Sequence, residues 1–131
     1  RVCTEDSLFY VPEVELGVTL PWGATPRLIH EIGAARARQM IMTSERIDGL
    51  KAAEWGLVHE VTQTVDELDD SIERWVQKIL ALPAMSVQMS KYQLRGYNQL
   101  SRLGDLSEFD GDASARAIQT DDAQSRFGNF N

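Results

Sequence analysis

A loop between residues 12 and 27 contains the side chain best suited to chemistry, the carboxylic acid of Glu13. Proline fixes its own φ, so Pro12 restricts the direction of the residue that follows it. If apolar neighbours such as Leu16 and Trp22 shield Glu13 from water, desolvation favours its protonated form. Such a carboxyl group can both give and take a proton near neutral pH. The alternative is that Glu13 is an exposed loop glutamate and Trp22 a core residue.

The elements around this loop explain how it is held. Three prolines and two glycines within sixteen positions exclude a continuous helix there and predict a shaped loop. Short runs of β-prone residues come before the loop, and strong helix formers come after it. The predicted elements up to residue 62 are strands over 2–3, 8–11 and 57–61, helices over 27–32 and 34–42, and a helical turn capped by Asp48 that ends at Trp55.

The rest of the chain is predicted to be helical. Thr64 or Asp66 is expected to start a helix that ends at Pro83. Between residues 65 and 82 of this helix, apolar side chains recur at steps of three and four and form one stripe. A further helix runs over 85–103, and Gly104 separates it from an acidic helical tail that we expect to be solvated. The stripe and the further helix offer more apolar surface than a short chain can cover, which predicts self-association.

Composition and charge exclude several classes of function. The chain has 131 residues, 43% of them hydrophobic and 25% charged, which is typical of a soluble globular protein. A net charge of −7 disfavours nucleic-acid binding, and no apolar run approaches the ~18–20 residues that cross a membrane. One cysteine, Cys3, excludes an internal disulfide, and with two histidines there is no zinc-binding cluster. We therefore expect a cytoplasmic protein without a metal site.

Two or three short strands cannot form a self-sufficient sheet, because such sheets need more strands or a covering layer. The chain also begins at Arg1 and not at Met. Both observations predict that it is the rear part of a larger α/β unit.

Several motifs carry a family resemblance. Residues 9–17 (FYVPEVELG) and 21–28 (PWGATPRL) resemble the strand–loop–helix segment of the crotonase superfamily, the enoyl-CoA hydratase/isomerase family. Residues 56–61 (GLVHEV) are similar to the family's Gly-Leu-Val-x-x-Val signature. The resemblance implies an α/β chain that forms the rear part of a crotonase-like (ClpP/crotonase) spiral fold. Residues 1–62 would end the core and carry the acyl-pocket loop, and residues 63–131 would form a C-terminal helical oligomerisation region.

The resemblance also implies site residues. Glu13 falls on the acidic position that acts as acid/base at the substrate α-carbon in hydratases and moves the proton along the acyl chain in isomerases. Pro12, Leu16 and Pro21 fall where the family lines the acyl pocket, and Trp22 is expected beside them. No cofactor or metal is implied, because coenzyme A is part of the substrate.

The same resemblance implies partners and a reaction. The substrate would be an acyl-CoA thioester, and the protein a homo-oligomer, either a trimer or a dimer of trimers. The oxyanion-hole amides and the hydratase's other glutamate lie upstream of the segment matching Arg1, so the chain is expected to need a missing N-terminal half and to be inactive alone. The tail departs from the family because it lacks a Glu-Gly pair and a Lys-Arg pair.

Three functions stay open at this point. The first is an enoyl-CoA hydratase of acyl-CoA or fatty-acid catabolism, which adds water to a trans-2-enoyl-CoA. The second is an enoyl-CoA isomerase or another acyl-CoA enzyme of the superfamily, since one scaffold supports many reactions. The third is a catalytically inert assembly module. A second glutamate upstream would favour hydration.

Overall fold

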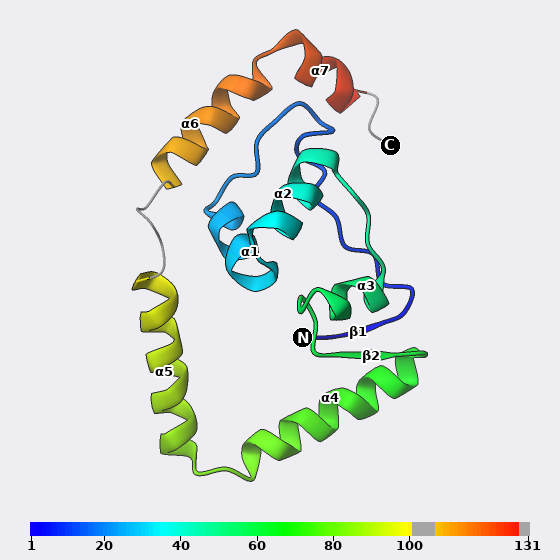
Figure 1. Cartoon of the computed structure of the whole chain (residues 1–131), viewed down its shortest axis with the longest axis vertical. Helices are drawn as coiled ribbons and strands as arrows, with labels where there is room; N and C mark the ends of the chain where they lie inside the picture. The colour runs from blue at the N-terminus through cyan, green and yellow to red at the C-terminus, as the bar shows by residue number, and fades with distance from the viewer. Residues whose placement is uncertain (101–106, 129–131) are drawn as a thin grey trace.

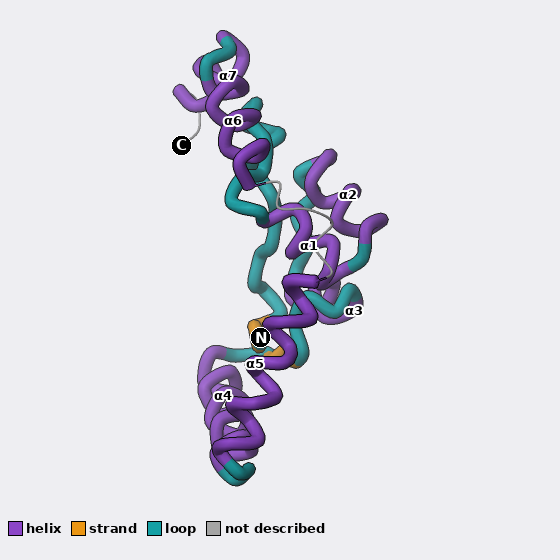
Figure 2. Tube along the Cα trace, turned by 90° about the vertical axis from the view of Figure 1, so that its left-hand side faces the viewer, coloured by secondary structure: helices purple, strands orange, loops and turns teal. Residues whose placement is uncertain are grey.

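A short parallel pair of strands lies at the centre of the chain, with helices on both sides (Figure 1). The computed structural model describes residues 1–100 and 107–128. Helices α1 to α3 lie on one side of the strands, and α4 lies on the other. The chain then continues through α5 and returns through α6 and α7, so that α4 and α7 lie at opposite ends in the rotated view (Figure 2). The architecture is α/β, as the sequence predicts.

Strand β1 (Val2–Thr4) pairs in parallel with strand β2 (Glu60–Thr62), and Cys3 lies opposite Val61. Parallel strands need a long crossover, and residues 5–59 provide it. The strand predicted over 57–61 thus begins later, at Glu60. The strand predicted over 8–11 was wrong, because in the described residues this run makes one isolated antiparallel bridge, from Phe9 to Ile47.

Three short helices form the crossover: α1 (Ala24–Ile32), α2 (Ala34–Thr43) and α3 (Gly49–Glu54). Helix α1 begins before the predicted residue 27. Pro26 is tolerated because it lies in the first turn, where the backbone N–H groups have no partner within the helix. The predicted cap of α3 is confirmed, since the Asp48 carboxylate accepts a hydrogen bond of 2.8 Å from the Lys51 backbone N–H.

The hydrophobic core lies between these helices and the strands. Burial raises the pKa of the Cys3 thiol, against a smaller opposing effect of its hydrogen bond with Ser7. Helix α3 approaches β1 so closely that a Cβ built on Gly49 would lie 2.2 Å from the Thr4 carbonyl oxygen. The buried cluster consists of Cys3, Val11, Ile32, Ala37, Met40, Ile47, Ala52, Trp55 and Val58.

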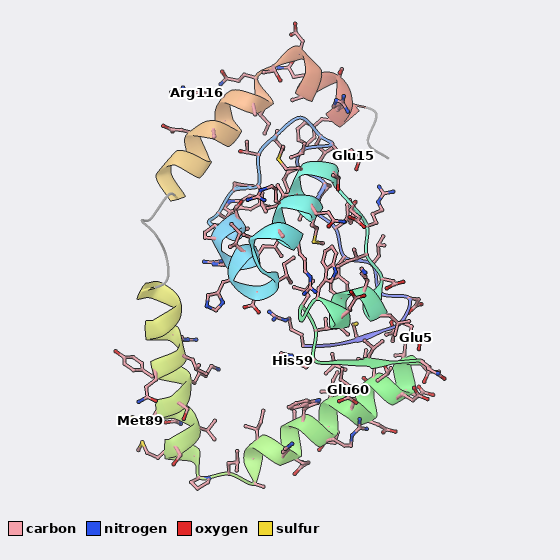
Figure 3. The ribbon with its side chains drawn as sticks, viewed as in Figure 1. Glu5, Glu15, His59, Glu60, Met89 and Arg116 are labelled. Carbon is pink, nitrogen blue, oxygen red and sulfur yellow. The ribbon has the colours of Figure 1, made fainter. Side chains whose placement is uncertain are left out.

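Helix α4 (Val65–Leu80) packs on both strands. Its predicted start is confirmed, because the Thr64 hydroxyl caps it by accepting a hydrogen bond from the Glu67 backbone N–H. The Glu60 carboxylate on β2 accepts hydrogen bonds from Trp75 Nε1 (2.8 Å) and Arg74 Nη2 (2.5 Å). Figure 3 shows Glu60 between β2 and α4. This polar contact joins the helix to the sheet.

The remaining helices are α5 (Ala84–Leu100), α6 (Ser107–Ile118) and α7 (Asp121–Gly128). In Figure 1, α5 stands apart from the core. The predicted end of this helix, Leu103 with Gly104 after it, lies outside the described residues. Among the described residues, no helix is both long and apolar enough to cross a membrane. The exposed apolar side chains of α4, α5 and the turn between them include Ile72, Trp75, Val76, Ile79, Leu80, Leu82, Met85, Met89, Tyr92 and Leu94. We call this set the α4–α5 apolar face.

Candidate active site

Glu13 lies in a compact turn that spans residues 12–18. Its backbone carbonyl accepts a hydrogen bond of 2.8 Å from the Val18 N–H, and the Pro12 carbonyl accepts one of 3.0 Å from the Leu16 N–H. Gly17 has a φ of 79°, a left-handed conformation that glycine adopts without strain. These bonds fix the backbone that carries the carboxyl group.

The Glu13 side chain carries a buried oxygen. Its Oε2 atom is shielded from solvent and has no hydrogen-bond partner among residues 1–100 and 107–128, while the residue as a whole is half-buried. Leaving a buried polar group unpaired typically costs about 1–3 kcal/mol, and more for a charged group. Such exceptions in native proteins are frequently functional. The structure therefore excludes the alternative of a freely solvated loop glutamate.

The predicted acyl-pocket residues lie in this turn or just after it, and they differ in solvent exposure. Pro12, Leu16 and Pro21 are half-buried. Trp22 is 77% exposed, so the alternative that it is a core residue was wrong. Its φ of 61° is a left-handed conformation that bulky side chains rarely adopt. Because such backbone strain concentrates at functional sites, Trp22 is the second unusual feature of this loop after Glu13.

Helix α7 packs against the same turn, a contact that sequence reasoning missed. The Ala123 side chain is fully buried, and a Cβ built on Gly17 would lie 3.0 Å from the Ala123 Cα. Arg126 Nη1 donates a hydrogen bond of 3.1 Å to the Glu15 carbonyl oxygen. Figure 3 places Glu15 near α7 and the end of α2. The tail is thus only partly solvated; the one available signal was the small residue Ala123 between polar neighbours.

An open hollow of about 470 Å³ lies beside the turn. Arg46 stacks 4.9 Å from the ring centre of Tyr10, and its Nη2 atom lies 3.8 Å from a carboxylate oxygen of Glu15. Glu13 does not line this hollow. No group of three or more metal-binding side chains occurs in the part of the chain that the structure describes. The lining residues are Val14, Glu15, Met42, Thr43, Ser44 and Arg46.

Solved structures similar to this chain define its class. An enoyl-CoA hydratase/isomerase from Pseudoalteromonas atlantica superposes with a TM-score of 0.85 at 19% identity, covering 98% of this chain and 51% of that one. An enoyl-CoA hydratase from Bacillus halodurans gives a TM-score of 0.83 at 14% identity, over 99% and 51% of the two chains. The chain therefore has a crotonase-type α/β fold, as the sequence predicts.

Sequence comparison then identifies the family. The family model described as enoyl-CoA hydratase/isomerase matches residues 1–130, and the chain belongs to this family. A short-chain-enoyl-CoA hydratase from Clostridium acetobutylicum is 29% identical over 122 residues, covering 93% of this chain and 46% of the relative. A crotonyl-CoA hydratase from Syntrophomonas wolfei is 33% identical over 91 residues, covering 70% and 35%.

A peroxisomal Δ(3,5)-Δ(2,4)-dienoyl-CoA isomerase from Arabidopsis thaliana is 30% identical over 101 residues, covering 77% of this chain and 36% of the relative. The relatives therefore include both hydratases and an isomerase. The chain spans between a third and a half of the length of these relatives.

Proposed function

We propose that this chain forms the rear half of an enoyl-CoA hydratase that adds water to a trans-2-enoyl-CoA thioester. The observation that carries the proposal is the buried, unpartnered Oε2 atom of Glu13, on a turn held by three backbone hydrogen bonds, in a chain of this family. A carboxyl oxygen that is shielded from water and has no hydrogen-bond partner among the described residues is available for a proton transfer to substrate.

The proposed chemistry assigns one step to Glu13. Water adds to the β-carbon of the enoyl thioester, the thioester oxygen takes up negative charge as an enolate, and the Glu13 carboxyl group delivers a proton to the α-carbon. Fixed N–H donors must stabilise the enolate oxygen, and a second carboxylate must take a proton from the water. We assign both to a segment that precedes Arg1, so the chain alone is expected to be inactive.

The acyl chain is proposed to lie against Pro12, Leu16 and Pro21, with Trp22 at the rim. The half-buried state of the first three and the exposure of Trp22 support an apolar wall with an open edge. Coenzyme A enters as part of the substrate, and the mechanism uses no other cofactor.

The protein is proposed to be a trimer or a dimer of trimers. The α4–α5 apolar face supports self-association, because each large apolar side chain that becomes buried contributes roughly 1.5–3 kcal/mol. Residues 63–131 form the oligomerisation region of this proposal and residues 1–62 the end of the catalytic core. A cytoplasmic location stays a prediction from the lone cysteine.

A hydration assay with crotonyl-CoA on the complete protein tests the proposal. Glu13→Gln should lower turnover by a factor on the order of 10²–10⁴, because it removes the proton donor and keeps the shape. Glu15→Gln is the matched control, since Glu15 lies in the same turn and faces the Arg46 side of the hollow. Full turnover in Glu13→Gln would remove this residue from the mechanism.

An isomerase is the second candidate, supported by the dienoyl-CoA isomerase among the relatives. It needs Glu13 alone to move a proton along the acyl chain, so activity on a 3-enoyl-CoA without hydration would favour it. The third candidate, an inert assembly module, predicts a stable oligomer by light scattering with no turnover of either substrate.

A further inference from the structure

Two contacts tie the last helix of the chain to the turn that carries Glu13. The first is steric: the backbone of Gly17 approaches Ala123 so closely that a side chain on Gly17 would lie 3.0 Å from the Ala123 Cα. The second is polar: Arg126 donates its hydrogen bond to the Glu15 carbonyl oxygen across a sequence separation of 111 residues. Figure 1 shows α7 above the loop that follows β1.

Both contacts fall in the turn that carries Glu13, on the C-terminal side of this residue. The carbonyl of Glu13 accepts the Val18 N–H, and the carbonyl of Val14 accepts the Gly17 N–H. Helix α7 therefore touches residues 15 and 17, which lie inside the same hydrogen-bonded unit as Glu13. A shift of α7 moves this unit, because a turn of seven residues with three internal hydrogen bonds has little freedom to absorb the displacement.

The packing at Ala123 is specific for size. Ala123 is fully buried, although most described side chains of α7 are exposed. Ala123 faces Gly17. A side chain on Gly17 is disfavoured by its left-handed φ and by the closeness of Ala123. Neither residue can grow without separating the helix from the turn.

We propose that α7 positions the Glu13 carboxyl group, with Ala123 and Arg126 as positioning residues for the proton transfer. This proposal rests on the proposed role of Glu13. A displacement of about 1 Å at a catalytic group can lower the rate about 10²-fold. A contact that moves the Glu13 carboxyl group indirectly is therefore expected to change the rate measurably. Pro12 and Leu16 of the proposed acyl wall belong to the same hydrogen-bonded unit, so a shift of α7 is also expected to have a smaller effect on substrate affinity.

The main experiment compares Ala123→Leu with Ala115→Leu in the complete protein. Ala115 is exposed on α6, so it is a matched control for helix-surface bulk. Ala123→Leu is expected to lower kcat for crotonyl-CoA by about 10- to 100-fold and to raise KM by a clearly smaller factor, because the rate depends on the exact position of the Glu13 carboxyl group more steeply than acyl binding depends on Pro12 and Leu16. Ala115→Leu is expected to leave both unchanged.

A double variant separates positioning from general damage. If Ala123 acts through Glu13, Ala123→Leu should cause no further loss once Glu13 is Gln, since interacting sites are non-additive. An additive loss, or a proportional rise in KM, would overturn the proposal. If Glu13→Gln instead keeps the wild-type turnover, the proposed function is contradicted. The failure of the proposed function can therefore be told apart from the failure of the positioning role of α7.

A milder variant covers the case in which Ala123→Leu fails to fold. Arg126→Ala removes one hydrogen bond to a carbonyl, so kcat should fall about two- to tenfold. Arg116→Ala on α6 is its control and should retain the wild-type kcat. Equal kcat values in all three proteins would overturn the role assigned to Arg126.

Discussion

Residues 1–62 contain a buried apolar cluster, whereas most large apolar side chains of α4 and α5 are exposed. In residues 1–62, Ile47 is 2% exposed and packs in the buried cluster, whereas Ile79 of α4 is 48% exposed on the α4–α5 apolar face. Both regions have well-formed helices with side-chain caps at Asp48 and Thr64. A helix can therefore be regular and well capped even where its apolar side chains are not packed against other parts of the described chain. The difference indicates which region buries an apolar cluster of its own and which leaves its apolar side chains for other protein to cover.

The largest expected effect tests the region with the buried cluster. Gly49→Ala should lower the free energy of unfolding by about 3 kcal/mol, the upper part of the range for overpacked cores, because its Cβ would lie 2.2 Å from the Thr4 carbonyl oxygen. Gly96→Ala, inside α5 with open space around it, should raise the free energy of unfolding by about 0.5–1 kcal/mol. Urea titration measures both. If both substitutions change the free energy of unfolding in the same direction, the contrast between the two regions is wrong.

The next effect tests the α4–α5 apolar face. Ile79→Glu should weaken self-association by about 10- to 100-fold, because it removes the roughly 1.5–3 kcal/mol gained by burying the side chain. Light scattering across protein concentrations measures the oligomer. Leu50→Glu on α3 is the control, since Leu50 is also an exposed apolar residue but lies in the other region. An equal decrease of the oligomer mass in both variants would show that the α4–α5 apolar face has no special role in self-association.

A smaller effect concerns the acyl loop. Trp22→Gly should stabilise the fold by about 0–2.5 kcal/mol, because the relief of about 1–3 kcal/mol of strain exceeds the glycine entropy cost of about 0.5–1 kcal/mol. The same variant should raise KM for an enoyl-CoA substrate, since it removes the proposed rim of the pocket. A variant that is less stable and has an unchanged KM would contradict both the strain and the binding role.

The smallest effect concerns the contact that joins the two regions. The Ser71 hydroxyl, the Trp75 indole N–H and the Arg74 guanidinium lower the pKa of the Glu60 carboxyl in the folded state. Its contribution to stability is therefore present above the ordinary glutamate pKa of about 4.3 and is lost as the pH falls through the lower folded-state pKa. Above about pH 5, wild type should be slightly more stable to urea than Glu60→Gln, and the difference should shrink toward pH 3. If the difference in stability between wild type and Glu60→Gln stays constant over this pH range, the ionisation of Glu60 does not contribute to the stability of the fold.

Local chemistry made much of the fold predictable. The Asp48 and Thr64 caps and the apolar stripe of α4 follow from residue types and spacing, and the structure confirms them. The start of α1 was misplaced because a proline in the first helical turn was treated as a helix breaker. The run at 8–11 has β-prone residues, but a strand also needs a ladder partner, and Phe9 has only Ile47 in the described residues.

The candidate site was less predictable for the same physical reason. The position of Glu13 on a turn after a proline could be read from the sequence, whereas the burial of its Oε2 atom depends on which other segments cover it. The pairing of Gly17 with Ala123 joins residues far apart in the chain, and neither residue type marks a contact by itself. Trp22 was expected as a pocket residue or a core residue, and its left-handed backbone has no local sequence signal.

The distance along the chain between Glu15 and Arg126, 111 residues, also has a kinetic meaning. Closing so long a loop is an entropic cost that short-range contacts do not carry, so long-range contacts of this kind form late. During synthesis, α7 leaves the ribosome after nearly all of the described chain has already emerged. The turn of residues 12–18 can reach its final arrangement only after α7 has emerged, and until then a nascent protein lacks the contacts that hold this turn from the far end of the described chain.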